Sequence, residues 1–207
     1  IRVQDNEADV TNIPQSADYP NAVFRPSRMR TPKEALAERL SNAKERNQAD
    51  RLIGTLDVIE PEIRDAEVIY SSGSGPSISC DIGWEDRLVP LGVMGEGVAR
   101  LLEIALSFVD CEGGILLIDE MENGFHHSVH QKVWENIGEL AREFDTQVFA
   151  TTHSYECIEA AHNAFSSDAS EYDFQLIRLD ETESGIDSVQ YSRQELESAL
   201  EGGFEIR

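Results

Sequence analysis

The sequence has very little lysine: only Lys33, Lys44 and Lys132 occur among 207 residues. Arginine does not compensate, since the 17 basic residues face 40 aspartates and glutamates and leave a net charge of −23. A surface this acidic repels phosphate backbones, so we expect no direct contact with DNA by this chain. The same imbalance is typical of proteins from salt-rich cytoplasms, and a halophilic source therefore remains open.

Cysteine and long apolar runs are scarce as well. Three cysteines, Cys80, Cys111 and Cys157, are scattered without CxxC spacing, which argues against a disulfide framework and favours reduced thiols. No apolar run approaches the roughly 20 residues that span a bilayer, and no signal peptide opens the chain. The hydrophobic content of 40% is ordinary for a folded domain. We therefore expect a cytoplasmic globular protein with no membrane contact.

The beginning of the chain lacks the pattern of a compact domain. Residues 1–31 read as an irregular segment with prolines at 14, 20 and 26, and the first residue is not Met, so we expect a piece of a longer protein. From Pro32 the segment "PKEALAERLSNAKERN" predicts a helix with proline in its first turn. A further apolar stripe at helical spacing extends this helical arm over residues 32–70.

Residues 71–207 alternate between predicted strands and helices. Short strands with Gly, Ser and Pro turns come first, in "AEVIYSSGSGPSISCDIGWEDRLVPL". There follow a helix in "VARLLEIALSFVD", a buried strand in "GGILLID", a helix at 129–144, a buried strand in "TQVFATTHS", a helix in "SYECIEAAHNAF", strands near 173–179 and 186–191, and a short helix in "SRQELESAL". This alternation of strands and helices predicts an α/β fold with a mostly parallel sheet flanked by helices.

Chemically active side chains follow the ends of two consecutive predicted strands. Asp119 and Glu120 follow "ILLI", and His153 follows "FATT". Ligands of parallel sheets bind beyond the carboxyl ends of the strands, so we expect these side chains to converge at one edge. A carboxylate there can hold hydrated Mg²⁺ beside a phosphate, a second can orient or deprotonate water, and a histidine can hydrogen-bond a terminal phosphate.

A glycine pair precedes one of the predicted helices. In "MGEG" the two glycines allow backbone amides to approach an anion, and the helix N-terminus adds partial positive charge. The pair is unspecific by itself. Its place in the order of elements carries more information: glycine pair, helix, aliphatic strand with Asp-Glu, helix, and strand with His.

That order resembles the C-terminal lobe of ABC-type ATPase heads, which have a P-loop NTPase fold, and most closely the AAA-like ATPases of the OLD (overcoming lysogenisation defect) family. The resemblance runs from about Ala49 to the C-terminus. It implies an ATPase that uses ATP and Mg²⁺ and pairs head to tail as a homodimer. In such a pair "MGEG" of one subunit meets the nucleotide of the other, so that Gly95, Glu96 and Gly97 contact its γ-phosphate.

The resemblance also assigns roles to the other motifs. "ILLIDE" is similar to a Walker B motif, with Asp119 in the magnesium shell and Glu120 as general base. "TTHS" is similar to the switch-histidine loop and places His153 at the γ-phosphate. "MENGFHHSVH" is similar to the D-loop region and implies that Glu122, Gly124 and His126 lie near the subunit interface.

The largest departure from the family is the absence of a Walker A loop, GxxxxGK[ST], whose lysine and amides cradle phosphates. The family places this loop and a glutamine loop upstream, so we expect missing sequence before Ile1 and an inactive chain in isolation. The closing "YSRQELESALEGGFEIR" resembles the natural end of stand-alone members. OLD-like proteins often work with a TOPRIM nuclease in DNA processing or phage defence, which here implies a separately encoded partner.

Three alternatives remain open from the residues. The fold could serve as an interaction module that does not hydrolyse nucleotide. Asp119, Glu120 and Glu122 could form a two-metal nuclease centre, although neighbours on a strand point to opposite faces and the basic surface expected for DNA is absent. His130 lies three residues after His127 and four after His126, so either pair could share a helix face and bind zinc. No third ligand is evident, and we expect His127 and His130 to be solvated.

Overall fold

The fold was analysed in a computed structural model that describes residues 2–4, 7–9, 20–28, 31–71, 73, 75–84, 87–166, 172–182, 185–204 and 206. Its centre is a parallel three-stranded sheet in the order β3 (Ala22–Arg25), β7 (Ile115–Ile118) and β8 (Gln147–Ala150). The short aliphatic sequences of β7 and β8, each followed by polar residues, were predicted as buried strands, and both are confirmed.

Helices connect and cover this sheet on one face. α3 (Glu96–Asp110) leads into β7, and α4 (His130–Glu143) connects β7 to β8 after a short 3-10 turn, η3 (His127–Val129). Their apolar stripes are buried together with Leu116 and Ile118 of β7 in one continuous core. Two parallel strands joined through a helix confirm the expected α/β fold with a parallel sheet flanked by helices.

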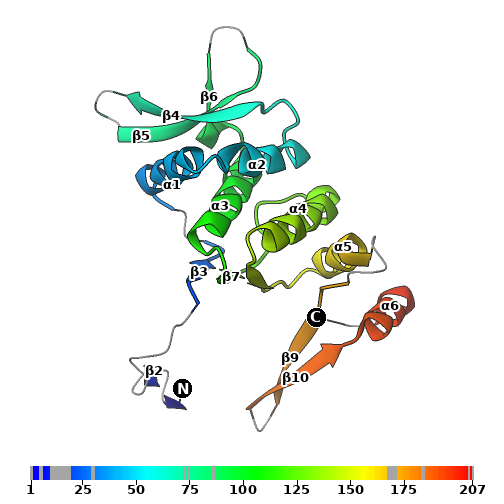
Figure 1. Cartoon of the computed structure of the whole chain (residues 1–207). Coiled ribbons are helices and arrows are strands. Elements are labelled where there is room, and N and C mark those ends of the chain that lie inside the picture. The colour runs from blue at the N-terminus through cyan, green and yellow to red at the C-terminus, as the bar shows by residue number, and fades with distance from the viewer. Residues whose placement is uncertain are drawn as a thin grey trace.

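The predicted arm packs on the opposite side of α3 (Figure 1). α1 (Lys33–Glu45), α2 (Ala49–Gly54) and η1 (Thr55–Val58) lie between α3 and an antiparallel sheet of β4 (Asp65–Ser71), β5 (Gly75–Asp81) and β6 (Val89–Pro90), which η2 (Leu91–Val93) joins to α3. The buried side chains of α1 and α2 belong to the same core as those of α3 and α4. The arm and the parallel sheet therefore share one hydrophobic core.

The remaining elements extend from this body. α5 (Tyr155–Ser166) follows β8, and its first turn is capped by Ser154 Oγ, which accepts from the amide of Cys157 at 3.1 Å. The hairpin of β9 (Leu176–Thr182) and β10 (Gly185–Tyr191) is followed by α6 (Arg193–Gly202), which a capping box of Ser192 and Glu195 begins. β1 (Arg2–Gln4) and β2 (Glu7–Asp9) form a separate antiparallel pair. None of the described helices is long and apolar enough to cross a membrane.

The expectation of an irregular segment through residue 31 is wrong at Arg2–Gln4, Glu7–Asp9 and Ala22–Arg25, which form β1, β2 and β3. β3 pairs with β7 over its whole length. The helices of the arm end with η1, and β4 confirms the strand predicted in "AEVIYSS". β3 has only four residues and lies between two prolines, so its sequence shows too little alternation of apolar and polar residues to be recognised as a strand. Its pairing with β7 makes it one. Residues 10–19 of the expected irregular segment lie outside the described residues.

The other face of the parallel sheet is uncovered among the described residues. Phe24, Leu117 and Phe149 stand opposite one another on the three strands and are 56%, 37% and 49% exposed. Leu116, the neighbour of Leu117, is fully buried on the helical face. Parallel sheets are normally covered on both faces, so this row of apolar side chains forms an unfinished core surface.

The two faces of β7 predict different costs for neighbouring substitutions. Leu116→Ala should destabilise the chain by about 2–5 kcal/mol, because it removes buried methyl groups and leaves a cavity. Leu117→Ala should cost less than about 1 kcal/mol, since its side chain already contacts solvent. Urea unfolding of the two variants measures the difference, and equal losses would contradict the one-sided burial of this sheet.

Candidate active site

The ends of β7 and β8 meet where the sequence analysis placed the reactive residues. Asp119 and Glu120 follow the last residue of β7, and residues 151–153 follow the last residue of β8. The amide of Thr151 donates to the carbonyl of Ile118, and the amide of Met121 donates to the carbonyl of Thr151, both at 2.9 Å. The sheet ladder therefore continues past the strands and holds the two reactive segments side by side.

The hydroxyl of Thr151 connects the two carboxylate residues. It donates to Oδ1 of Asp119 at 2.8 Å and accepts from the backbone amide of Glu120 at 2.9 Å. The hydrogen bond from Thr151 is the main cause that holds the pKa of Asp119 below its ordinary value, and hydrogen bonds from Ser27 act in the same direction. The lowered pKa favours the charged carboxylate, which is the form that binds a hard cation.

Glu120 adopts a backbone conformation that is rare for residues other than glycine, with φ at 46°. Its amide bonds Thr151, its carbonyl accepts from Arg100, and Oε2 accepts from the side-chain amide of Asn123. Strained residues of this kind persist only where their surroundings fix them, and they concentrate at functional sites. The contacts of Glu120 give its carboxylate a fixed direction.

Arg100 ties helix α3 to the same residues. Its Nη2 donates to the carbonyls of Asp119 and Glu120, both at 2.9 Å, and its Nη1 donates to the carbonyl of Ser27 at 3.3 Å. The sequence analysis missed Arg100, Ser27, Asn123 and Thr151. Thr151 and Asn123 stood in the quoted motifs "TTHS" and "MENGFHHSVH", and the position of Thr151 directly after β8 could have identified it. Arg100 lies on a helix and gives no local indication of this contact.

The loop after β7 touches the loop after β8. Oε1 of Glu122 accepts from the backbone amide of His153 at 2.8 Å, while its Oε2 is buried without a hydrogen bond. Gly124 has φ at 81°, and exposed His126 begins η3 by accepting from the amide of Ser128. Glu122 thus contacts the histidine loop of its own chain. An interface role for Glu122, Gly124 and His126 stays a prediction.

The glycine pair lies at the start of α3, and only its first member faces solvent. Gly95, with φ at 101°, and Glu96 are exposed, whereas Gly97 packs against the chain itself. A Cβ on Gly97 would lie 2.7 Å from the carbonyl oxygen of Gly124. Position 95 therefore favours glycine because of its positive φ. Position 97 requires glycine because the loop after β7 approaches it closely. The turn remains open toward an external ligand.

The histidines and acids do not form an obvious metal site. Among the described residues no group of three or more His, Cys, Asp and Glu side chains could hold a metal ion. His130, expected to be solvated, is buried, and burial lowers its pKa, whereas His127 is exposed as expected. The alternation argument against paired ions was wrong, because β7 ends at Ile118 and neither Asp119 nor Glu120 lies on a strand.

The parallel sheet flanked by helices has counterparts among solved structures. The chain is similar to a head structure described for the ATP-driven dimerization and DNA-stimulated activation of SMC ATPases. The TM-score is 0.53 at 15% identity, over 79% of this chain and 96% of the other. At that identity the likeness shows the shared fold.

The chain belongs to the AAA ATPase domain family, whose model matches residues 27–158, more than half of the chain. It is 38% identical over 74 residues to an ATP/GTP phosphatase of Helicobacter pylori. That match covers 34% of this chain and 20% of the relative, so the chain spans about a fifth of the length of this curated relative. It is also similar to the structure of an Smc head domain bound to the C-terminal domain of ScpA from Pyrococcus furiosus. The identity is 15% and the TM-score 0.49, and the match covers 80% of this chain and 40% of the other.

The contact between Thr151 and Asp119 predicts a measurable titration change. Thr151→Val removes the hydrogen bond that favours the charged carboxylate, so the pKa of Asp119 should rise toward its ordinary value. Carboxyl ¹³C NMR measures this titration, and the ionised form should be lost at a higher pH than in the parent chain. Thr152→Val is the matched control, because the Thr152 hydroxyl instead accepts from the amide of Ser154. Equal titration curves for Asp119 in Thr151→Val and in the parent would refute the assignment.

The contact between Gly97 and Gly124 predicts a steric cost. Gly97→Ala should destabilise the chain by about 1 kcal/mol or more, because the new methyl group meets a backbone carbonyl that cannot rotate away. Gly92→Ala should stay within about 0.5 kcal/mol, since the structure has open space around Gly92 and no positive φ there. Thermal unfolding of both variants provides the comparison, and a harmless Gly97→Ala would show that this approach is loose.

Proposed function

We propose that this chain is the distal part of an ABC-type, OLD-like ATPase that binds and hydrolyses ATP at a head-to-tail dimer interface. The observation that carries the proposal is the fixed geometry of Asp119 and Glu120 against the 151–153 segment. One hydroxyl group orders both acids, and Glu122 holds the backbone of His153. Hydrolysis would drive a partner or an attached module.

The proposed chemistry divides among these side chains. Asp119, ionised and ordered by Thr151, is the ligand for Mg²⁺. Magnesium bound with ATP would supply positive charge against the phosphates. Glu120, held in one direction by Asn123 and Arg100, positions water and accepts its proton. His153 hydrogen-bonds the γ-phosphate, and the exposed turn at Gly95 donates backbone amides to the nucleotide of the second subunit.

In this proposal a second part of the protein or complex supplies most of the phosphate binding, since the sequence contains no GxxxxGK[ST] loop. The sheet offers a place for that part. Within the described residues β8 pairs with β7 alone, and a cavity of about 960 Å³ lies between its open edge, α5 and the start of β9. We propose that a strand carrying the phosphate loop joins this edge and that its helix covers Phe24, Leu117 and Phe149.

The proposed dimer rests on the exposed glycine turn and on the head structures with the same fold. A head-to-tail pair with two-fold symmetry would bring Gly95 and Glu96 of each molecule to the nucleotide of the other. ATP-driven dimerization is described for the SMC ATPase that this chain is similar to. The OLD-like resemblance adds, as proposals, a separately encoded TOPRIM nuclease and a role in DNA processing or phage defence. The three free, buried cysteines favour a cytoplasmic location.

The proposal predicts a catalytic role for Glu120. In a protein or complex that includes a GxxxxGK[ST] loop, Glu120→Gln should lower the rate of ATP hydrolysis by about a hundredfold or more, because the general base is lost. ATP binding should persist, since the magnesium ligand Asp119 remains. Phosphate release and nucleotide binding are measured in parallel.

Glu112→Gln is the matched control, because it removes the same charge from an exposed position at the other end of β7. Its hydrolysis rate should equal that of the parent. If Glu120→Gln hydrolyses ATP as fast as the parent, the enzyme proposal fails, and an interaction module on the same fold becomes the better reading. DNA cleavage with manganese and no nucleotide would support the nuclease alternative.

A further inference from the structure

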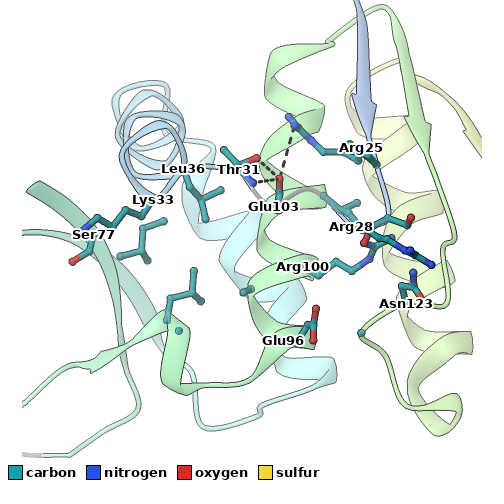
Figure 2. Close-up of a pocket in the computed structure, with 18 of the residues that line it drawn as sticks. Arg25, Arg28, Thr31, Lys33, Leu36, Ser77, Glu96, Arg100, Glu103 and Asn123 are labelled. Carbon is teal, nitrogen blue, oxygen red and sulfur yellow. Dashed lines mark hydrogen bonds and ion pairs between the residues drawn. The ribbon is translucent and has the colours of Figure 1, made fainter.

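A second concave site lies on the side of α3 that faces the arm (Figure 2). Its volume is about 720 Å³, within the range of small-molecule sites. The segment that follows β3, the start of α1, the end of β5 and the first turns of α3 form its walls. Asp119, Glu120 and His153 do not line it, but Arg100 and Asn123, which contact the two acids, do. The pocket therefore adjoins the proposed hydrolytic site and opens on the other side of these contacts.

The pocket concentrates positive charge in a strongly acidic protein. Its lining includes four of the 17 basic residues of the chain, namely Arg25, Arg28, Lys33 and Arg100, but only two of the 40 acidic ones. A cleft lined mainly by one sign of charge focuses its field and attracts ligands of the opposite sign. In a chain with a net charge of −23, this local excess points to an anionic ligand.

Two of these arginines have capacity left for an anion. Arg28 is exposed and forms no hydrogen bond or ion pair within the described residues. Arg100 donates to carbonyl oxygens, and no carboxylate of the described residues lies within ion-pair distance of it. Figure 2 shows Arg28, Arg100 and Asn123 together on one side of the pocket. Guanidinium groups with a side-chain amide are well suited to bind the oxygens of a phosphate.

Arg25 marks the inner wall of the same pocket. It is 9% exposed, its Nε donates to Ser107 Oγ at 2.5 Å, and its Nη2 is buried without a hydrogen bond. Glu103 and Asp110 lie 3.9 and 3.7 Å from its guanidinium nitrogens. Burial lowers the pKa of both Arg25 and Arg100, so a bound anion would offset part of the cost of desolvating these two cations.

The pocket also has an apolar wall. Leu36, Ile78 and Leu91 line it, although all three side chains are largely buried in the core. An inorganic ion would leave this part of the pocket unused. We propose that the pocket binds a small organic phosphate, with its phosphate at Arg28, Arg100 and Asn123 and its apolar part over Leu36, Ile78 and Leu91.

The test uses the 207-residue chain in buffer with EDTA, so that magnesium-dependent nucleotide binding at Asp119 does not contribute. The fluorescent probe is N-methylanthraniloyl-AMP, and unlabelled AMP competes against it. Arg28→Ala should weaken AMP binding by about tenfold or more, because it removes charge-assisted hydrogen bonds to the phosphate. Arg28 is exposed and has no partner among the described residues, so its loss should leave the unfolding temperature unchanged.

Arg46→Ala is the matched control, since it removes the same charge from an exposed residue at the other end of α1. Its effect on AMP binding should stay within about twofold. Equal losses in Arg28→Ala and Arg46→Ala, or the absence of saturable AMP binding, would overturn the proposal. Competition by inorganic phosphate as strong as by AMP would reduce the pocket to an ion site, and equal competition by polyglutamate would assign it to acidic peptides; both results contradict an organic phosphate. Failure of ATP hydrolysis in the Glu120 experiment would leave this binding intact.

Discussion

The hydrogen bonds of the Thr151 hydroxyl hold the candidate site together. One oxygen donates to Asp119 and accepts from the amide of Glu120, so the end of β8 orders both acids at the end of β7. This contact exists only because β7 and β8 are parallel neighbours in register, which brings Ile118 opposite Ala150 and the two following segments together. The lowered pKa of Asp119 and the left-handed backbone of Glu120 both accompany this pairing. The remaining contacts of the site build on it.

Helix α3 connects the parts of the site that the proposed mechanism needs at once. Its first turn carries the exposed Gly95, Gly97 packs against the loop after β7, and Arg100 binds the carbonyls of Asp119 and Glu120. A helix is stiff over these few residues, so a displacement of its N-terminus would reach the acid pair through Arg100. In the proposed dimer, the same helix would link the second subunit at the glycine turn to Asp119 and Glu120 of the first.

The apolar and charged surfaces of the chain lie in different places. Phe24, Leu117 and Phe149 are exposed on one face of the sheet, beside the edge of β8 that has no partner strand among the described residues. Arginines gather on the other side of α3 despite the acidic composition, in a pocket that the arm closes. The first surface favours protein, because it offers backbone and apolar side chains. The second favours an anion, because it offers guanidinium groups over an apolar wall.

The amino-acid sequence alone determined the α/β class, the order of most helices and strands, and the convergence of Asp119, Glu120 and the 151–153 segment, because these follow from local periodicity and from the polarity of parallel sheets. The tertiary structure alone decided the rest. The sequence of β3 is typical of a loop, and β3 forms a strand because β7 supplies its hydrogen bonds. His130 is buried by the packing of α4 against the rest of the chain. Thr151 and Arg100 act across 32 and 19 positions of sequence. Contacts over such separations leave no local pattern, since they depend on which surfaces the folded core brings together.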